Sequence, residues 1–236
     1  MTDRPILQSV KLGFTRGYLI KCSGGYLLID TSDRRYFRLF QKRTAKLGID
    51  PSEIRYLLLT HHHDDHAGFA AELVKKTGCR LVVHRNAVRP LTQGKAEYEA
   101  CKALNLWVQF IMMFYSWYYA LVYGSTFPPL TFTDNDTVLE GDNDSFLRGI
   151  GIDGVVLHTP GHSADSISVL LSDGSAFVGD AAMNLPWLSG RRHMPIGVTD
   201  TEAVYESWQN LREHGATEIY PAHGKPFAAQ ELVPLL

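Results

Sequence analysis

The stretch IRYLLLTHHHDDH, residues 54–66, decides how this chain folds. Its first six residues are mostly apolar, which is typical of a strand buried in a sheet. The pattern His-x-His-x-Asp-His follows at once and is formed by His61, His63, Asp65 and His66. Buried carboxylates and imidazolium groups need a partner, and a metal cation is the strongest one. The stretch therefore predicts a metal-binding loop at the end of a buried strand, although histidine runs also occur in solvated loops.

Three later segments repeat this arrangement, because a His or Asp follows a predicted strand beside Gly or Pro. These residues are His162, Asp180 and His223. Each of them alone is more typical of an ordinary turn. Together with the histidine run they predict ligands presented along one edge of a sheet, where functional loops usually lie.

Apolar periodicity predicts further strands and helices on both sides of the histidine run. We expect strands at 18–21, 26–29, 54–59, 80–83, 155–158, 167–171, 175–178 and 218–220, and helices at 34–47, 67–77 and 201–214. No internal repeat or Pro/Ser-rich linker divides the chain. Because strands and helices mix in both halves, we expect an α/β fold with helices covering the sheets, in a single domain of residues 1–236.

Composition limits the kinds of partner. The chain has 236 residues, 45% of them hydrophobic, and a formal net charge of −2. This balance does not favour a nucleic-acid groove or a polybasic membrane contact. The first residues lack the apolar core of a signal peptide, so we expect a cytoplasmic protein. Cys22, Cys79 and Cys101 are odd in number and match no zinc-finger or redox spacing, so we expect reduced thiols.

The chain resembles the metallo-β-lactamase-fold hydrolase superfamily on the residues quoted above. Asp30, at the end of the predicted strand 26–29, also matches the early strand-end aspartate of that superfamily. The resemblance runs from about residue 17 to about residue 226. It implies a four-layer αββα sandwich with a site for two metal ions between the sheets.

The resemblance implies seven ligands in two groups that share one carboxylate. They are His61, His63 and His162 for the first metal, Asp65, His66 and His223 for the second, and Asp180 for both. An imidazole and carboxylate set suits zinc, which we expect on family grounds, and also tolerates iron or manganese. Asp30, Thr60 and His84 are candidates to orient the ligands by hydrogen bonds, with an ordinary structural role equally open for His84.

The implied activity is hydrolysis of a small-molecule substrate by a hydroxide that bridges the two metals. Asp65 would orient this nucleophile and receive a proton. The bridging position holds no cysteine, unlike the commonest zinc β-lactamases, and His63 is not a glutamate, unlike the flavodiiron branch. These departures favour the glyoxalase-like, lactonase-like and phosphodiesterase-like branches. We expect a lactone, thioester or other carboxylic ester with an apolar acyl part. A phosphodiesterase and a non-catalytic metal-binding regulatory module are the alternatives.

A helical insertion is expected at about residues 86–129. Its centre, residues 103–123, has no charged residue and contains eight aromatic residues. The length would suit a membrane span, but both flanks carry ligands of one site, so we expect none. We favour a lid that lines the substrate pocket; a homodimer contact and a membrane-surface patch stay open. Candidate substrate contacts are Trp107, Phe114, Trp117 and Tyr118.

Overall fold

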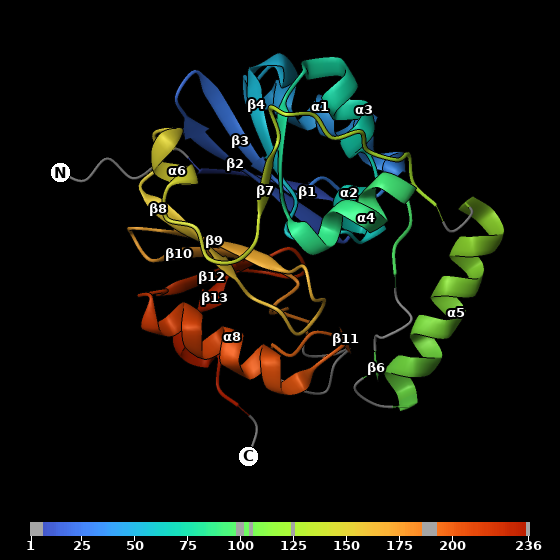
Figure 1. Ribbon diagram of the computed structural model, residues 1–236. Helices are drawn as coiled ribbons and strands as arrows, with labels where there is room; N and C mark the ends of the chain where they lie inside the picture. The colour runs from blue at the N-terminus through green and yellow to red at the C-terminus, as the bar shows by residue number, and fades with distance from the viewer. Residues whose placement is uncertain (1–6, 98–101, 104–105, 124–125, 186–192, 235–236) are drawn as a thin grey trace.

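Two β-sheets face each other, and helices cover the outer side of each (Figure 1). The computed structural model describes residues 7–97, 102–103, 106–123, 126–185 and 193–234. The first sheet has the strand order β1-β2-β3-β4-β5-β7. Its strands are β1 Leu7–Leu12, β2 Thr15–Cys22, β3 Gly25–Ile29, β4 Ile54–Leu58, β5 Arg80–His84 and β7 Thr137–Leu139.

The second sheet has the order β13-β12-β10-β9-β8, and a third, small sheet pairs β11 with β6. The strands are β6 Lys102–Ala103, β8 Gly154–His158, β9 Ile167–Leu171, β10 Ser175–Gly179, β11 Gly197–Val198, β12 Glu218–Pro221 and β13 Phe227–Ala228. The α-helices are α1 Phe37–Lys46, α2 Asp64–Ala67, α3 Ala70–Thr77, α4 Arg85–Gln93, α5 Leu106–Tyr123, α6 Phe146–Gly149 and α8 Thr201–Glu213. The 3₁₀ turns among the described residues are η1 Arg34–Tyr36, η2 Pro51–Glu53 and η3 Ala229–Glu231.

Alternating side chains divide the apolar core into three layers. Leu28 and Leu57 lie in the layer that also contains α1 and α3 residues, whereas their neighbours Leu27 and Leu58 lie in the layer between the two sheets. Trp208 of α8 lies in the third layer, against the second sheet. Successive strand residues point to opposite faces, so each sheet buries both faces. The predicted four-layer αββα sandwich is therefore confirmed.

The direction of the strands brings the ligand-type residues to one place. Strands β3, β4 and β5 are parallel, so their carboxyl ends meet at one edge of the first sheet. Asp30 follows β3, and the histidine run at 61–66 follows β4 shortly after its end. Strands β10 and β12 are parallel in the second sheet, and Asp180 and His223 follow them. Carboxyl ends of parallel strands are the usual place for binding sites in α/β folds.

Several local details differ from the sequence prediction. The helix expected at 67–77 begins later, at Ala70, as α3, and the separate single turn α2 precedes it at Asp64–Ala67. Gly68 follows α2 so closely packed that an added Cβ would lie 2.4 Å from the Asp64 carbonyl oxygen and 2.5 Å from the Arg34 nitrogen. The chain turns at Gly68, in this confined space, so α2 and α3 are separate. The turn α2 carries two ligand-type residues, Asp65 and His66, which were expected in a loop.

The expected insertion has two parts. Its first helix, α4, contributes Ala87 and Leu91 to the apolar layer outside the first sheet. The segment that follows α4 begins and ends at the same place on the main body. There the Phe127 amide donates to the Gly94 carbonyl, and Lys95 forms a β-bridge with Thr126. Helix α5 then stands apart from both sheets (Figure 1). In the part of the chain that the structure describes, no helix combines the length and hydropathy needed to cross a bilayer.

Replacing Phe40 tests the outer apolar layer. Phe40 is fully buried and its ring centroid lies 5.3 Å from that of Phe69. We expect Phe40→Ala to lower the free energy of unfolding by about 3–5 kcal/mol, because the cavity adds to the lost transfer free energy. Urea denaturation measures this change. Leu47→Ala, at a side chain 41% exposed, is the control and should cost about 1 kcal/mol or less. Equal losses in both variants would contradict the position of α1.

Candidate metal centre

Histidine and aspartate side chains from both sheets gather in one buried cluster. Three groups place their ligand atoms within 4.8 Å of one another: His61, His63 and His162; His61, His66 and Asp180; and Asp65, His66 and His223. All of these side chains are buried except that of Asp65, which is 37% exposed. The cluster thus contains the seven residues that the resemblance implied as ligands. Their role as metal ligands stays a prediction.

Three imidazoles converge in the first group. His63 Nδ1 lies 3.0 Å from His61 Nε2 and 3.0 Å from His162 Nε2. Burial lowers the pKa of all three rings, and neighbouring rings lower the pKa of His61 and His63 further. The rings are therefore neutral at physiological pH. Neutral imidazoles that direct nitrogen atoms to one point are the form in which histidine binds a metal ion.

The second group combines imidazoles with carboxylates. His223 Nε2 lies 3.1 Å from Asp65 Oδ2 and 3.3 Å from Asp180 Oδ1, and His66 Nε2 lies 3.4 Å from Asp180 Oδ1. Burial opposes the charge of His223, but Asp180 and Asp65 outweigh it and raise its pKa to about 10. His66 Nε2 and Asp180 Oδ1 are buried and lack a hydrogen bond within the described residues. A buried imidazole nitrogen and a buried carboxylate oxygen without hydrogen-bond partners are suited to bind a cation between them.

Asp180 lies between the two groups. Its Oδ1 faces His66 and His223, while its Oδ2 lies 3.6 Å from His162 Nε2. Burial would raise the pKa of Asp180, but His223 and His66 hold it well below its usual range, so the carboxylate is ionised. The preceding Gly179 has φ 52° and would place a Cβ 2.3 Å from Thr60 Oγ1. A glycine is therefore required where the strand turns to present Asp180.

Asp30 organises two of the imidazoles. Its Oδ1 accepts from the Thr60 amide at 2.7 Å, and its Oδ2 accepts from Thr60 Oγ1 at 2.8 Å and from His66 Nδ1 at 2.9 Å. Because the Thr60 hydroxyl has a single proton, its oxygen accepts from His61 Nδ1, 3.1 Å away. His61 and His66 therefore turn their Nε2 atoms into the cluster. These hydrogen bonds agree with the orienting role expected of Asp30 and Thr60, which stays a prediction until a metal is shown to bind.

Backbone carbonyls orient two further imidazoles. His162 Nδ1 donates to the Gly197 carbonyl at 2.7 Å, and His223 Nδ1 donates to the Phe14 carbonyl at 3.2 Å. Both rings therefore direct Nε2 into the cluster. Sequence reasoning did not find Gly197 or Phe14, because a backbone acceptor leaves no trace in residue type.

His84, the third orienting candidate, makes different contacts. Its Nδ1 accepts from the Asn86 amide at 3.2 Å, which caps α4, and its ring stacks on His158 with centroids 4.3 Å apart. These contacts match the structural alternative that the sequence left open.

His62 lies between two expected ligands in the sequence, but its ring has other partners. Its Nδ1 donates to Asp165 at 3.0 Å, and its Nε2 accepts from the Glu97 amide at 3.1 Å. Asp165 was missed because its sequence context is that of an ordinary turn acid.

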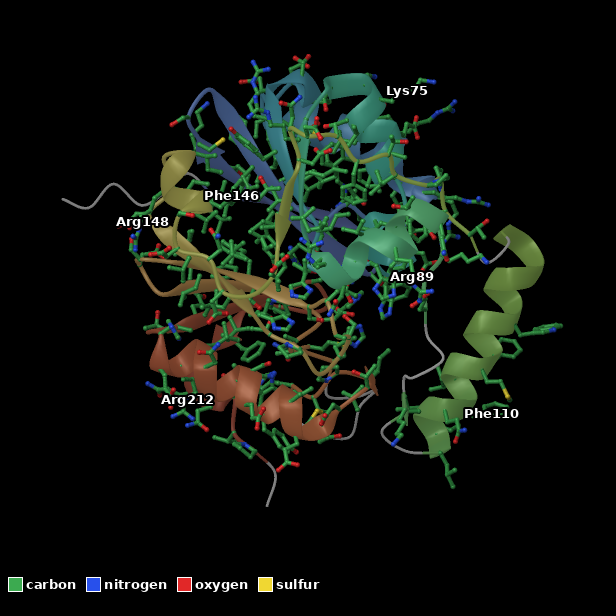
Figure 2. The ribbon with its side chains drawn as sticks, viewed as in Figure 1. Lys75, Arg89, Phe110, Phe146, Arg148 and Arg212 are labelled. Atoms are coloured by element: carbon green, nitrogen blue, oxygen red, sulfur yellow. The ribbon has the colours of Figure 1, made fainter. Side chains whose placement is uncertain are left out.

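The described aromatic side chains of α5 are exposed to solvent. The side chains of Trp107, Phe114 and Trp117 are 65%, 59% and 60% exposed on α5. Figure 2 shows Phe110 on the same helix, well away from the two sheets. The side chain of Tyr118, the fourth candidate substrate contact, is not among the side chains that the structure describes. Substrate contact by these residues stays a prediction that the described geometry does not support.

Removing the Asp30 carboxylate tests its orienting role. We expect Asp30→Ala to weaken zinc binding about 10- to 100-fold, because His66 and Thr60 lose their shared acceptor. Competition with a chromogenic chelator measures this affinity. Asp134→Ala, at an exposed aspartate, is the matched control and should bind zinc as the wild type does. The same affinity in both variants would contradict the role of Asp30.

The raised pKa of His223 predicts proton release on metal uptake. In the metal-free protein burial opposes the charge, but Asp180 and Asp65 raise the pKa to about 10 from the ordinary 6.5, so the ring is protonated at neutral pH. Because a metal ion binds only the neutral ring, zinc affinity should rise as the pH rises above neutrality. The same shift stabilises the metal-free fold fully below pH 6.5, and this stabilisation is lost as the pH rises through about 10.

Titration calorimetry in buffers of different ionisation enthalpy measures the protons released. Zinc uptake at neutral pH should release about two protons per chain, because the pKa values of His66 and His223 are both raised and each ring must lose a proton before it binds the metal. Uptake whose heat is the same in all buffers would contradict the assignment of His223 as a protonated group that the metal displaces.

Comparison with known proteins places this geometry in a family. The profile of the metallo-beta-lactamase superfamily matches residues 10–223. A curated relative, the metallo-beta-lactamase fold-containing protein ST1585 of Sulfurisphaera tokodaii, is 32% identical over 131 residues, which are 55% of this chain and 45% of that protein. The matched segment thus spans less than half the length of that relative.

Solved structures show the same fold. The metallo-beta-lactamase family protein TTHA1429 from Thermus thermophilus superposes with a TM-score of 0.66 at 23% identity, covering 96% of this chain and 76% of that chain. BJP-1, a subclass B3 metallo-beta-lactamase of Bradyrhizobium japonicum, gives 0.62 at 22% identity, covering 94% and 76%. At these identities the likeness concerns the fold alone. The match of the family profile across both sheets nevertheless establishes that the chain belongs to the metallo-β-lactamase superfamily.

Proposed function

We propose that this protein is a hydrolase that uses two divalent metal ions, with zinc as the favoured metal. One observation carries the proposal: Asp180 turns one oxygen toward His162 and the other toward His66 and His223. A single buried carboxylate thus lies between two groups of ligand atoms. Two-metal hydrolases need such a group to hold two cations close together.

The residues fit the proposed metals chemically. The first ion would be held by the three neutral imidazoles of the first group. The second would be held by Asp65, His66 and His223, with Asp180 shared. Imidazole nitrogens and carboxylate oxygens suit zinc and also tolerate iron or manganese. When bound, the pair supplies Lewis acidity and lowers the pKa of water toward neutrality.

Asp65 is the candidate catalytic residue. Burial would raise its pKa, but His66 and His223 hold the pKa of this carboxyl well below its usual range. The side chain is 37% exposed, unlike the other members of the cluster, so it can meet substrate and solvent. We assign it the tasks of orienting the attacking water and accepting its proton. Thr15 supports it by donating from Oγ1 to Asp65 Oδ2 at 3.5 Å.

The proposed substrates are lactones, thioesters and other carboxylic esters with an apolar acyl part. Phe14 supports this class, because its side chain is 80% exposed while its backbone carbonyl accepts from His223. A residue with an exposed aromatic side chain thus contacts a ligand-type residue through its backbone. Apolar and aromatic walls are typical of small-molecule sites. The net charge of −2 gives no general attraction for phosphodiesters.

Metal analysis combined with a substrate panel tests the proposal. The purified protein would be analysed for metals by mass spectrometry and assayed on chromogenic lactone, thioester and phosphodiester substrates, before and after chelation. We expect about two metal ions per chain and chelator-sensitive hydrolysis of an acyl substrate. Bound metal without turnover on any of these substrates would favour the non-catalytic binding module. Preference for the phosphodiester would overturn the substrate class.

The Asp65→Asn variant tests the assignment of the proton acceptor. An amide cannot take a proton from water, so we expect kcat to fall by about 100- to 10,000-fold. The three imidazoles of the first group should still bind metal, which mass spectrometry checks in the same sample. Asp134→Asn is the control and should retain wild-type kcat. A kcat for Asp65→Asn within a few-fold of this control would remove Asp65 from the mechanism.

A further inference from the structure

Helix α5 presents a continuous apolar face to solvent. Six large side chains on it are 58–83% exposed: Leu106, Trp107, Phe110, Met113, Phe114 and Trp117. At 100° per residue they fall within an arc of about 120°. Val108 points to the opposite side and is 1% exposed, so the helix has a definite inner side. A contiguous apolar surface made of six large side chains is typical of an interaction site rather than of ordinary solvent-facing surface.

The spacing of these residues identifies the kind of partner. Leu106, Phe110, Met113 and Trp117 recur at intervals of four, three and four residues. This is the seam along which two helices pack side by side. Trp107 and Phe114, seven residues apart, flank the seam on one side. The exposure of all six shows that no described part of this chain covers it.

The base of the segment that carries this face is attached to the main body at two points. Strand β6, just before α5, pairs with β11 through Ala103 and Gly197. The segment closes where the Phe127 amide donates to the Gly94 carbonyl. Figure 1 shows α5 standing outside both sheets. The seam is therefore presented outward by a helix that is joined to the body on both sides.

A second copy of this chain is the partner that fits best. The six side chains leave roughly 800 Å² exposed, which is the share that one partner contributes to an interface of standard size. Residues 103–123 carry no charge, so two such helices can approach without repulsion. Helices that lie on a bilayer surface carry Lys or Arg on a polar face, and α5 has neither. We infer that α5 packs against α5 of a second copy and forms a two-fold symmetric dimer.

Molar mass in solution tests the dimer. Light scattering coupled to size exclusion should give twice the chain mass for the wild type and the single chain mass for the Phe110→Glu/Trp117→Glu double variant. Leu47→Glu, at an exposed apolar residue of the main body, is the matched control and should stay dimeric. A wild type that is monomeric across a dilution series would overturn the inference. So would a double variant that stays dimeric.

Cross-linking gives a readout that does not depend on how the double variant folds. Met113 is the third residue of the seam, so Met113→Cys in a Cys101→Ser background should form a disulfide-linked dimer on mild oxidation. Val233→Cys, at a side chain 49% exposed elsewhere, should not. Equal cross-linking at both positions would overturn the inference. A wild-type monomer that sediments with phosphatidylcholine vesicles would assign the face to a membrane surface instead.

Discussion

Two carboxylates and five imidazoles share one space between the sheets, and their charges must balance there. Asp180 is buried and ionised, and its negative charge is met by His66 and His223. Three further imidazoles face the same space as neutral rings. Buried charges persist only when they are paired or bind a metal. The cluster therefore suits bound cations, and protonated His66 and His223 supply the positive charge when no metal is bound.

The fold supplies this arrangement through strand direction. Parallel strands in each sheet end at the same edge, so Asp30, Asp180 and His223 need only short turns to reach the cluster. The same turns carry the partners that orient the rings. Asp30 aligns Thr60 and His66, and the Gly197 carbonyl aligns His162. Gly197 also pairs with β6, so the same residue anchors the strand before α5 and orients the His162 ring.

The sequence predicted the sandwich and the members of the cluster well, because both leave local signals. Buried strands appear as apolar runs, and the residues after them are ligand types in a known order. The hydrogen bonds of Asp165 and Gly197 left no such signal, since a turn acid and a backbone carbonyl occur everywhere. The placement of α5 was equally hidden. The apolar composition of α5 predicts that another surface covers the helix, but only the structure shows that the main body of the chain does not.

Anomalous scattering from crystals of the zinc-loaded protein tests directly whether the seven residues hold two cations. We expect two peaks at the zinc edge, one among His61, His63 and His162 and one among Asp65, His66 and His223, with Asp180 between them. A crystal with no zinc peak in this cluster, or with zinc bound only elsewhere on the chain, would contradict this expectation.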